Sequence, residues 1–96
     1  MNQQIVDLII QVSNDLNEQL KNKIEVGKRE NADLFGENGV LDSLALVNLV
    51  VQVESAVEEK FGKSIILVDG ANGNEKQTHF ATVGSLAEYI NNLIES

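Results

Sequence analysis

The chain is organised around the stretch Gly39-Val40-Leu41-Asp42-Ser43-Leu44, where an irregular polar segment leads into the most hydrophobic helix of the sequence. Asp42 and Ser43 both carry side-chain oxygens that can accept an unpaired N–H group of the first helical turn. On physical grounds alone, simple capping is the favoured role of Ser43. If Asp42 caps instead, Ser43 occupies the first helical position with its hydroxyl in solvent. A hydroxyl there suits covalent attachment of a phosphate, because the helix N-terminus favours an anion.

Apolar residues at helical spacing predict a helix over residues 43–61, with Gly62 as its left-handed C-terminal cap. Its expected core stripe consists of Leu46, Leu49 or Val50, Val53, Val57 and Phe61. A second apolar row cannot face the same core; it is formed by Leu44, Val47 and Val51. Either this helix is buried on two sides or the second row borders a functional surface. Its many valines imply that packing stabilises the helix, because they are poor helix formers in isolation.

Upstream, apolar residues recurring every three or four positions predict an amphipathic helix over residues 3–23, with Lys21 and Lys23 in its last turn. The periodicity then fails over residues 25–41, where glycine and asparagine supply turn chemistry. A connection of this length needs packing of its own. We expect Val26, Leu34 and Phe35 to provide it, and Asn38-Gly39 to form a turn leading into the next helix.

Downstream, residues 65–68 are a continuous apolar run that we expect to be extended and to close the core, since no second strand is available to pair with it. Residues 69–78 should form the most mobile loop, with a short third helix within it or just after it. Thr82 is predicted to cap a last helix from Val83 to about Ile94. Its expected core residues are Val83, Leu86, Ile90, and Leu93 or Ile94, with Phe80 and Tyr89 in or near the core. The prediction is one all-α domain, residues 1–96: a small four-helix bundle of three long helices and one short, with a long loop between the first two.

The composition describes a small acidic domain. Its 96 residues include 43% hydrophobic but only 4% aromatic side chains and no proline, which favours a helical core of Leu, Ile and Val. Seven basic residues against fifteen acidic ones leave a net charge of −8, which argues against nucleic acid and favours basic protein partners. The excess is concentrated at residues 31–62, with six acids and one base. Because no signal peptide or membrane span is visible, we expect a soluble, cytoplasmic monomer without membrane insertion.

Catalytic patterns are weak, and we expect a protein that is not an enzyme. The absence of cysteine excludes disulfides, thiolate metal sites and thiol nucleophiles. His79, the single histidine, lies far along the chain from Ser43, and we expect it to be merely solvated. Gly62-Lys63-Ser64 follows a predicted helix and lacks the earlier glycine of a phosphate-binding loop. The polar residues 69–75 do not have the spacing of a calcium loop, so no metal site is predicted.

Three motifs in order resemble those of acyl carrier proteins. They are Asp42-Ser43-Leu44, Phe61-Gly62-Lys63-Ser64-Ile65, and Phe80-Ala81-Thr82-Val83-Gly84-Ser85-Leu86-Ala87-Glu88-Tyr89-Ile90. The resemblance covers roughly residues 34–94. It implies a four-helix bundle of acyl-carrier type, in which Ser43 carries a covalent 4′-phosphopantetheine arm that holds acyl intermediates as thioesters. The protein would then act as substrate and shuttle in fatty-acid-like biosynthesis, which belongs to lipid metabolism, or in secondary-metabolite biosynthesis.

The same resemblance assigns roles around Ser43. Asp42 caps the helix and helps a phosphopantetheinyl transferase to dock, and the row Leu44, Val47 and Val51 borders the attachment site. Basic surfaces of acyl-loading and acyl-processing enzymes would meet three acidic side chains, Glu54, Glu58 and Glu59. For these glutamates a merely solvated helix face is the alternative.

Two departures from the family pattern indicate a specialised carrier. Asn48 stands where the family has an acidic residue, and Phe61 comes about four residues late, which is one helical turn or about 6 Å. Because Val40-Leu41-Asp42-Ser43 also resembles aminoacyl and D-alanyl carriers, such a carrier is the first alternative. An unmodified acidic helical interaction module, with Ser43 as a cap only, is the second. A hydrolase using Ser43 and His79 is the most distant.

Overall fold

The computed structural model describes residues 3–36, 39–67 and 79–95, and in these ranges the protein is helical. The elements are α1 (Gln3–Asn17), a 3-10 helix η1 (Val26–Asn31), α2 (Ser43–Phe61) and α5 (Val83–Glu95). The described residues contain no strand, only two isolated bridges that join Asp33 to Thr82 and Phe35 to Leu41. The all-α prediction is therefore confirmed. The predicted mobile loop and short third helix fall largely on residues 68–78, outside the described residues.

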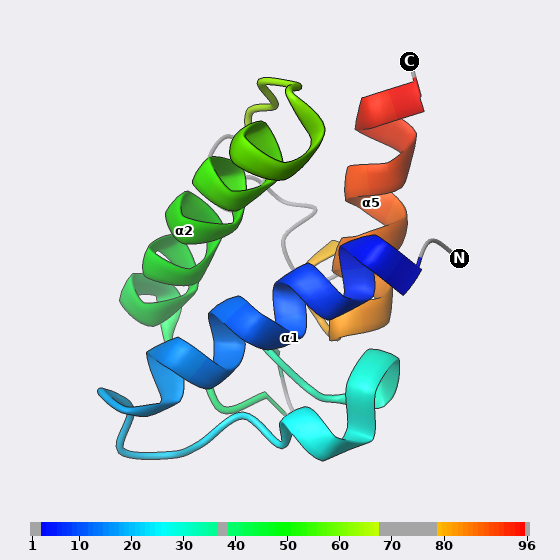
Figure 1. Ribbon diagram of the computed structural model, residues 1–96. Helices are drawn as coiled ribbons and strands as arrows, with labels where there is room; N and C mark the ends of the chain where they lie inside the picture. Colours follow the sequence, from blue (N-terminus) through cyan, green and yellow to red (C-terminus); the bar gives the residue numbers. More distant parts are fainter. Residues whose placement is uncertain (1–2, 37–38, 68–78, 96) are drawn as a thin grey trace.

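Helix α1 is the centre of the described architecture. Its backbone lies close to those of α2, α5 and η1, and η1 also lies close to α5, whereas α2 approaches only α1 among these elements. Figure 1 shows α1 crossing between α2 on one side and α5 on the other. The buried residues of α1 recur at helical spacing and are Ile5, Val6, Leu8, Ile9, Val12, Ser13 and Leu16. Among the described elements, α1 is thus the helix that packs on two sides, since α2 meets only α1 there.

Helix α1 ends at Asn17, six residues before the predicted end. The Asn17 side chain explains this, because its Oδ1 accepts the N–H of Ile24 at 2.7 Å and its Nδ2 donates to the Ile24 carbonyl at 2.9 Å. This pair of hydrogen bonds folds the following segment back, and Ile24 is buried from a loop. Lys23 was expected in the last turn of this helix, but it lies beyond the helix end. Its ammonium instead donates to the carbonyls of Asn17 and Leu20 at the helix end, where a cation is favourable.

The connection between α1 and α2 contains the 3-10 helix η1, which the sequence did not predict. Leu34 is fully buried and Val26 and Phe35 are partly buried, so the expected packing of this connection is confirmed. Arg29 has a φ of 53°, a conformation that is unfavourable for a side chain with a Cβ. Its guanidinium forms an ion pair with Asp7 of α1, which ties η1 to α1.

A close backbone approach joins η1 to α5. A Cβ built on Gly84 would lie 2.8 Å from the carbonyl oxygen of Glu30, so only glycine fits at this position of α5. Hydrogen bonds continue the contact, from Val83 N–H to the Ala32 carbonyl at 3.0 Å and from Leu34 N–H to the Ala81 carbonyl at 2.7 Å. The connection is therefore fastened to the start of α5.

Helix α2 has the predicted bounds. Gly62 follows it with a φ of 67° and donates its N–H to the Glu58 carbonyl, which confirms the left-handed cap. Its buried residues are Leu46, Leu49, Val50, Val53 and Val57. Phe61 is partly buried against this core.

Beyond α2, the apolar run is divided between core and solvent. Leu67 is buried, Ile65 is partly buried and Ile66 is 67% exposed, so the expectation that the run closes the core is correct only in part. Alternate exposure of Ile66 and burial of Leu67 is what successive side chains of an extended segment would show.

Helix α5 begins as predicted. Thr82 Oγ1 accepts the N–H of Ser85 at 3.1 Å, and Ser85 Oγ accepts the N–H of Thr82 at 3.0 Å, a reciprocal capping arrangement. Val83, Leu86 and Ile90 are buried as expected, together with Phe80 in front of the helix. Partly buried positions are Tyr89, Leu93 and Ile94.

Candidate functional site

Asp42, and not Ser43, caps helix α2. Its carboxylate Oδ1 accepts the N–H of Ala45 at 2.8 Å, and its backbone is extended with a ψ of 178°. The Asp42 carbonyl accepts the N–H of Leu46 at 2.9 Å, which is the first hydrogen bond of the helix. An aspartate in this position satisfies an otherwise unpaired donor and places negative charge at the positive end of the helix. Simple capping by Ser43, the role favoured from helix physics alone, is therefore wrong.

Ser43 is the first residue of α2 and is exposed. Within residues 3–36, 39–67 and 79–95, no hydrogen bond is formed by its hydroxyl. Asp42 accepts only the third N–H of the turn, so the N–H groups of Ser43 and Leu44 stay directed toward the helix N-terminus. The arrangement combines a reachable hydroxyl with the end of a helix dipole that attracts anions.

The second apolar row of α2 faces solvent next to Ser43. Leu44 is 78% exposed and Val51 is 46% exposed, while Val47 between them is half-buried. Exposed large hydrophobic side chains are ordinary when scattered, but two exposed and one half-buried on one helix face form an apolar strip. The structure thus places all three predicted row residues on the exposed side of α2, beginning directly beside Ser43.

The three predicted recognition glutamates do not form one surface. Glu54 is half-buried, and its carboxylate accepts the backbone N–H of Leu67, so it holds the segment after α2 in place. Glu58 is exposed and stands seven residues after Val51, on the side of the apolar strip. Glu59 is exposed too, but it lines a groove toward α1. Glu54 stands seven residues after Val47 and so lies on the same side of α2 as Glu58, but its carboxylate is bound to the Leu67 backbone.

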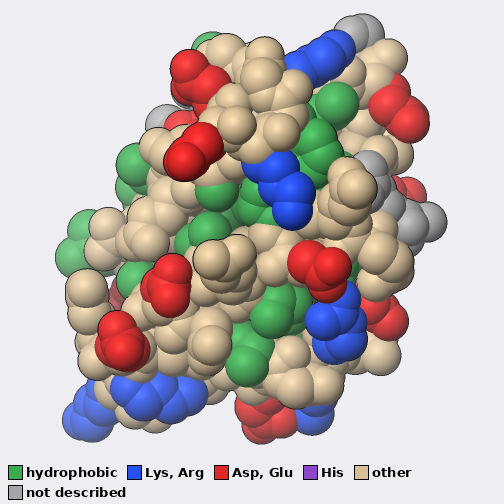
Figure 2. Space-filling model, viewed as in Figure 1, with side chains coloured by type: hydrophobic (Ala, Val, Ile, Leu, Met, Phe, Trp, Pro, Cys, Tyr) green, Lys and Arg blue, Asp and Glu red, His purple; other side chains and the backbone are tan. Residues whose placement is uncertain are grey.

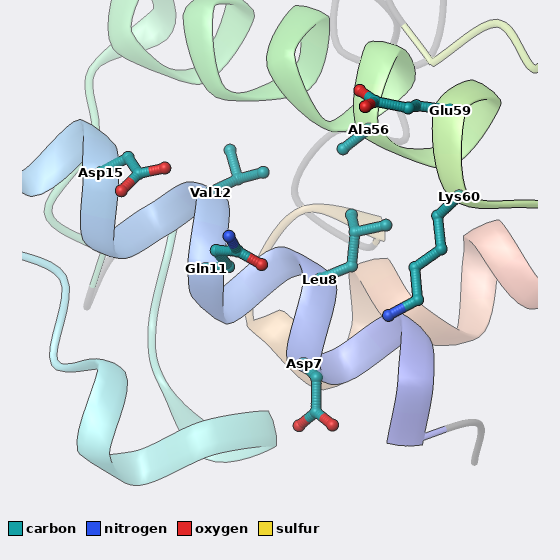
Figure 3. Close-up of a pocket in the computed structure, with 8 residues that line it drawn as sticks. All are labelled: Asp7, Leu8, Gln11, Val12, Asp15, Ala56, Glu59 and Lys60. Carbon is teal, nitrogen blue, oxygen red and sulfur yellow. The ribbon is translucent and has the colours of Figure 1, made fainter.

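A groove of about 470 Å³ lies between α1 and α2. It is lined by Asp7, Leu8, Gln11, Val12 and Asp15 of α1, and by Ala56, Glu59 and Lys60 of α2. Figure 3 shows Leu8 and Val12 turned toward Ala56, with Lys60 extending from α2 beside Leu8 toward α1. The sequence gives no sign of this groove, because its residues come from two helices and only their packing brings them together.

The sequence led us to expect that His79 is merely solvated, and this expectation is wrong. Its ring is half-buried and stacks on Tyr89, with the ring centroids 4.0 Å apart and the planes at 12°. Phe80 meets Tyr89 edge-to-face at 5.9 Å. In Figure 1 the start of α5 lies well away from the N-terminus of α2. The fold therefore does not bring His79 to Ser43 as a hydrolase would require.

The remaining sequence motifs have structural roles. The Lys63 ammonium of Gly62-Lys63-Ser64 donates a hydrogen bond to the Ile94 carbonyl at 3.1 Å, near the end of α5.

Across the described part of the chain, no three His, Cys, Asp or Glu side chains gather to hold a metal ion. No helix there is long and apolar enough to cross a membrane. Away from these motifs, Glu25 beside Lys28 raises the pKa of that ammonium, chiefly through their side-chain hydrogen bond.

Comparisons with protein-family models, with curated proteins and with solved structures found no match to this chain. The fold and the site around Ser43 are accordingly the basis for a functional proposal: an all-α domain with an exposed serine at the start of an apolar, acidic helix.

Proposed function

We propose that this protein is a carrier whose Ser43 bears a covalent 4′-phosphopantetheine arm. The observation that carries the proposal is the division of labour at the start of α2: Asp42 caps the helix, and Ser43 is exposed at its first position. The capping requirement is met without the serine, so its hydroxyl is available to a modifying enzyme. The resemblance of Asp42-Ser43-Leu44 to the acyl carrier motif supports the same assignment.

The residues around Ser43 fit such an arm. Its phosphate would lie at the positive end of α2, where the first N–H groups and the helix dipole favour negative charge. The strip of Leu44, Val47 and Val51 offers apolar surface beside the attachment point. The bound arm supplies a thiol, which the chain lacks because it has no cysteine. Its acyl thioesters would serve fatty-acid-like or secondary-metabolite biosynthesis.

Recognition by the modifying and acyl-processing enzymes would use the exposed face of α2. A net charge of −8 attracts basic surfaces and accelerates encounters without making the complexes tight. Glu58 and the apolar strip form the recognition surface, whereas Glu59 lines the groove toward α1. Glu54 contributes to this surface only by holding the segment after α2 in place, because its carboxylate accepts the backbone N–H of Leu67.

The test is the intact mass of the protein after incubation with coenzyme A and a broad-specificity phosphopantetheinyl transferase. Wild type should gain one phosphopantetheine, and Ser43→Ala should gain none. Ser55→Ala is the matched control, because Ser55 is an exposed serine of the same helix, and it should be modified like wild type. If wild type stays unmodified while the transferase modifies a known carrier, the proposal fails.

The loading enzyme separates an acyl carrier from an aminoacyl or D-alanyl carrier. Both require modified Ser43, so the mass experiment supports the two equally. An unmodified interaction module is favoured if Ser43→Ala leaves partner binding intact and wild type gains no arm. The exposure of Leu44 and Val51 is the observation that supports this second candidate, since an apolar strip also suits a stable partner.

A further inference from the structure

The groove between α1 and α2 has polar walls and an apolar floor. Asp7, Gln11 and Asp15 recur every four residues and form a ridge along α1, about 12 Å long. Glu59 and Lys60 form the opposite wall on α2, and the floor consists of Leu8, Val12 and Ala56. Figure 2 shows hydrophobic side chains along this groove with acidic ones beside them. The groove is therefore an elongated trough with helical walls.

The charges that border the trough are mostly negative and partly unpaired. Three carboxylates and one ammonium line it. Asp7 is paired with Arg29 of η1, and Figure 3 shows it pointing away from α2. Asp15 and Glu59 take part in no ion pair within the described ranges. Two unpaired carboxylates thus stand on opposite walls of the trough, one on each side of its apolar floor.

We propose that this trough binds a basic amphipathic helix of a partner protein. The apolar side of that helix packs on half-buried Ala56 and on the small exposed parts of Leu8 and Val12, which are 5% and 9% exposed. Its lysine or arginine side chains pair with Asp15 and Glu59. Helical walls and a ridge of two turns suit a helix laid into a groove. A second copy of this chain fits poorly, because its net charge of −8 repels the acidic walls.

This surface is separate from the one that we assign to the arm. Ala56 and Glu59 face α1, whereas Leu44, Val51 and Glu58 recur at seven-residue spacing on another side of α2. Both surfaces can therefore be occupied at the same time. The inference goes beyond the carrier proposal and does not depend on it, since Ser43→Ala leaves the trough unchanged.

The first experiment uses a synthetic peptide as the probe. The peptide has about four helical turns, with leucine at helical spacing on one side and lysine on its flanks. A second peptide carries glutamate in place of lysine. Each is titrated into the isotope-labelled full chain, and the backbone amide signals are followed by NMR. The lysine peptide should saturate, with the largest shifts at Leu8, Gln11, Val12 and Ala56. The glutamate peptide should not bind.

Matched charge variants then decide whether the trough is the site. Asp15→Lys combined with Glu59→Lys should weaken the lysine peptide about tenfold or more, equivalent to 1.4 kcal/mol. Glu88→Lys combined with Glu95→Lys makes the same change in net charge on exposed positions of α5, and it should alter affinity by no more than about twofold. Circular dichroism checks that both double variants keep their helix content.

Four results would overturn the proposal. One is the absence of saturable binding, and the second is equal weakening by the two charge variants, which would indicate attraction to net charge only. The third is a set of NMR shifts confined to Leu44, Val47 and Val51, which would place the basic helix on the recognition surface beside Ser43. Ala56→Phe fills the floor and should also reduce binding. Unchanged affinity in that variant would remove the trough as the site.

Discussion

The separation of capping from modification at the start of α2 can be tested by two single substitutions. Asp42→Ala removes the 2.8 Å hydrogen bond to the Ala45 N–H and the negative charge at the helix N-terminus. Loss of such a cap lowers the free energy of unfolding by about 0.5–2 kcal/mol. In a domain of this size, 1 kcal/mol corresponds to a fall in Tm of about 4–8 °C. Ser43→Ala removes no hydrogen bond of the described residues, and alanine is the better helix former, so stability should change by less than about 0.5 kcal/mol.

Asp42→Asn separates the two contributions of the aspartate. The amide oxygen can still accept the Ala45 N–H, whereas the charge is lost, so this variant should lose only about 0.3–1 kcal/mol. Urea unfolding followed by far-UV circular dichroism gives the three free energies, with unchanged m-values as the control for two-state behaviour. The mass assay should show modification of both Asp42 variants and none of Ser43→Ala. If Ser43→Ala is destabilised more than Asp42→Ala, the serine is the cap and the argument for its free hydroxyl is refuted.

Three further substitutions test the packing that positions the site. Gly84→Ala should lower stability by about 1–3 kcal/mol despite the higher helix propensity of alanine, because the new Cβ would lie 2.8 Å from the Glu30 carbonyl oxygen; thermal unfolding measures this, and a stabilised variant would contradict the close approach. Asn17→Ala should destabilise by about 1–3 kcal/mol, because both its hydrogen bonds to the backbone of Ile24 are lost; urea unfolding checks the value, and faster amide exchange at Ile24 should accompany it. Ser13→Ala should stabilise by about 0.5–2 kcal/mol, because the buried Ser13 hydroxyl has no hydrogen-bond partner in the described structure; a lower Tm for this variant would show that the hydroxyl is satisfied.

Hydrophobic periodicity and local chemistry were enough to predict α2 and α5. In α2 the apolar stripe and Gly62 define the helix and its end, and in α5 the threonine at position 82 marks the start. Both elements depend on interactions between residues a few positions apart, which a sequence displays directly. The candidate site was likewise visible as Asp42-Ser43-Leu44. Which of the two polar residues caps the helix was not, because both have suitable oxygens.

Longer-range contacts decided the rest. The apolar pattern of α1 continues past Asn17, but the Asn17 side chain binds the backbone of Ile24 and ends the helix. The helix η1 follows from packing against α1 and α5, where Gly84 permits a close approach. The spacing of apolar residues in the sequence indicates which side of a helix is apolar, but not which element that side packs against.

The sequence by itself determined the all-α class, the bounds of α2, the acidic charge and the serine at the start of its most hydrophobic helix. Tertiary structure alone decided that Glu54 serves the fold through Leu67, and that Glu59 faces a trough toward α1. Neighbouring glutamates look alike in a sequence, because each is equally polar and equally compatible with a helix. Their roles differ because the chain brings a different partner to each one, and that arrangement exists only once the helices have packed.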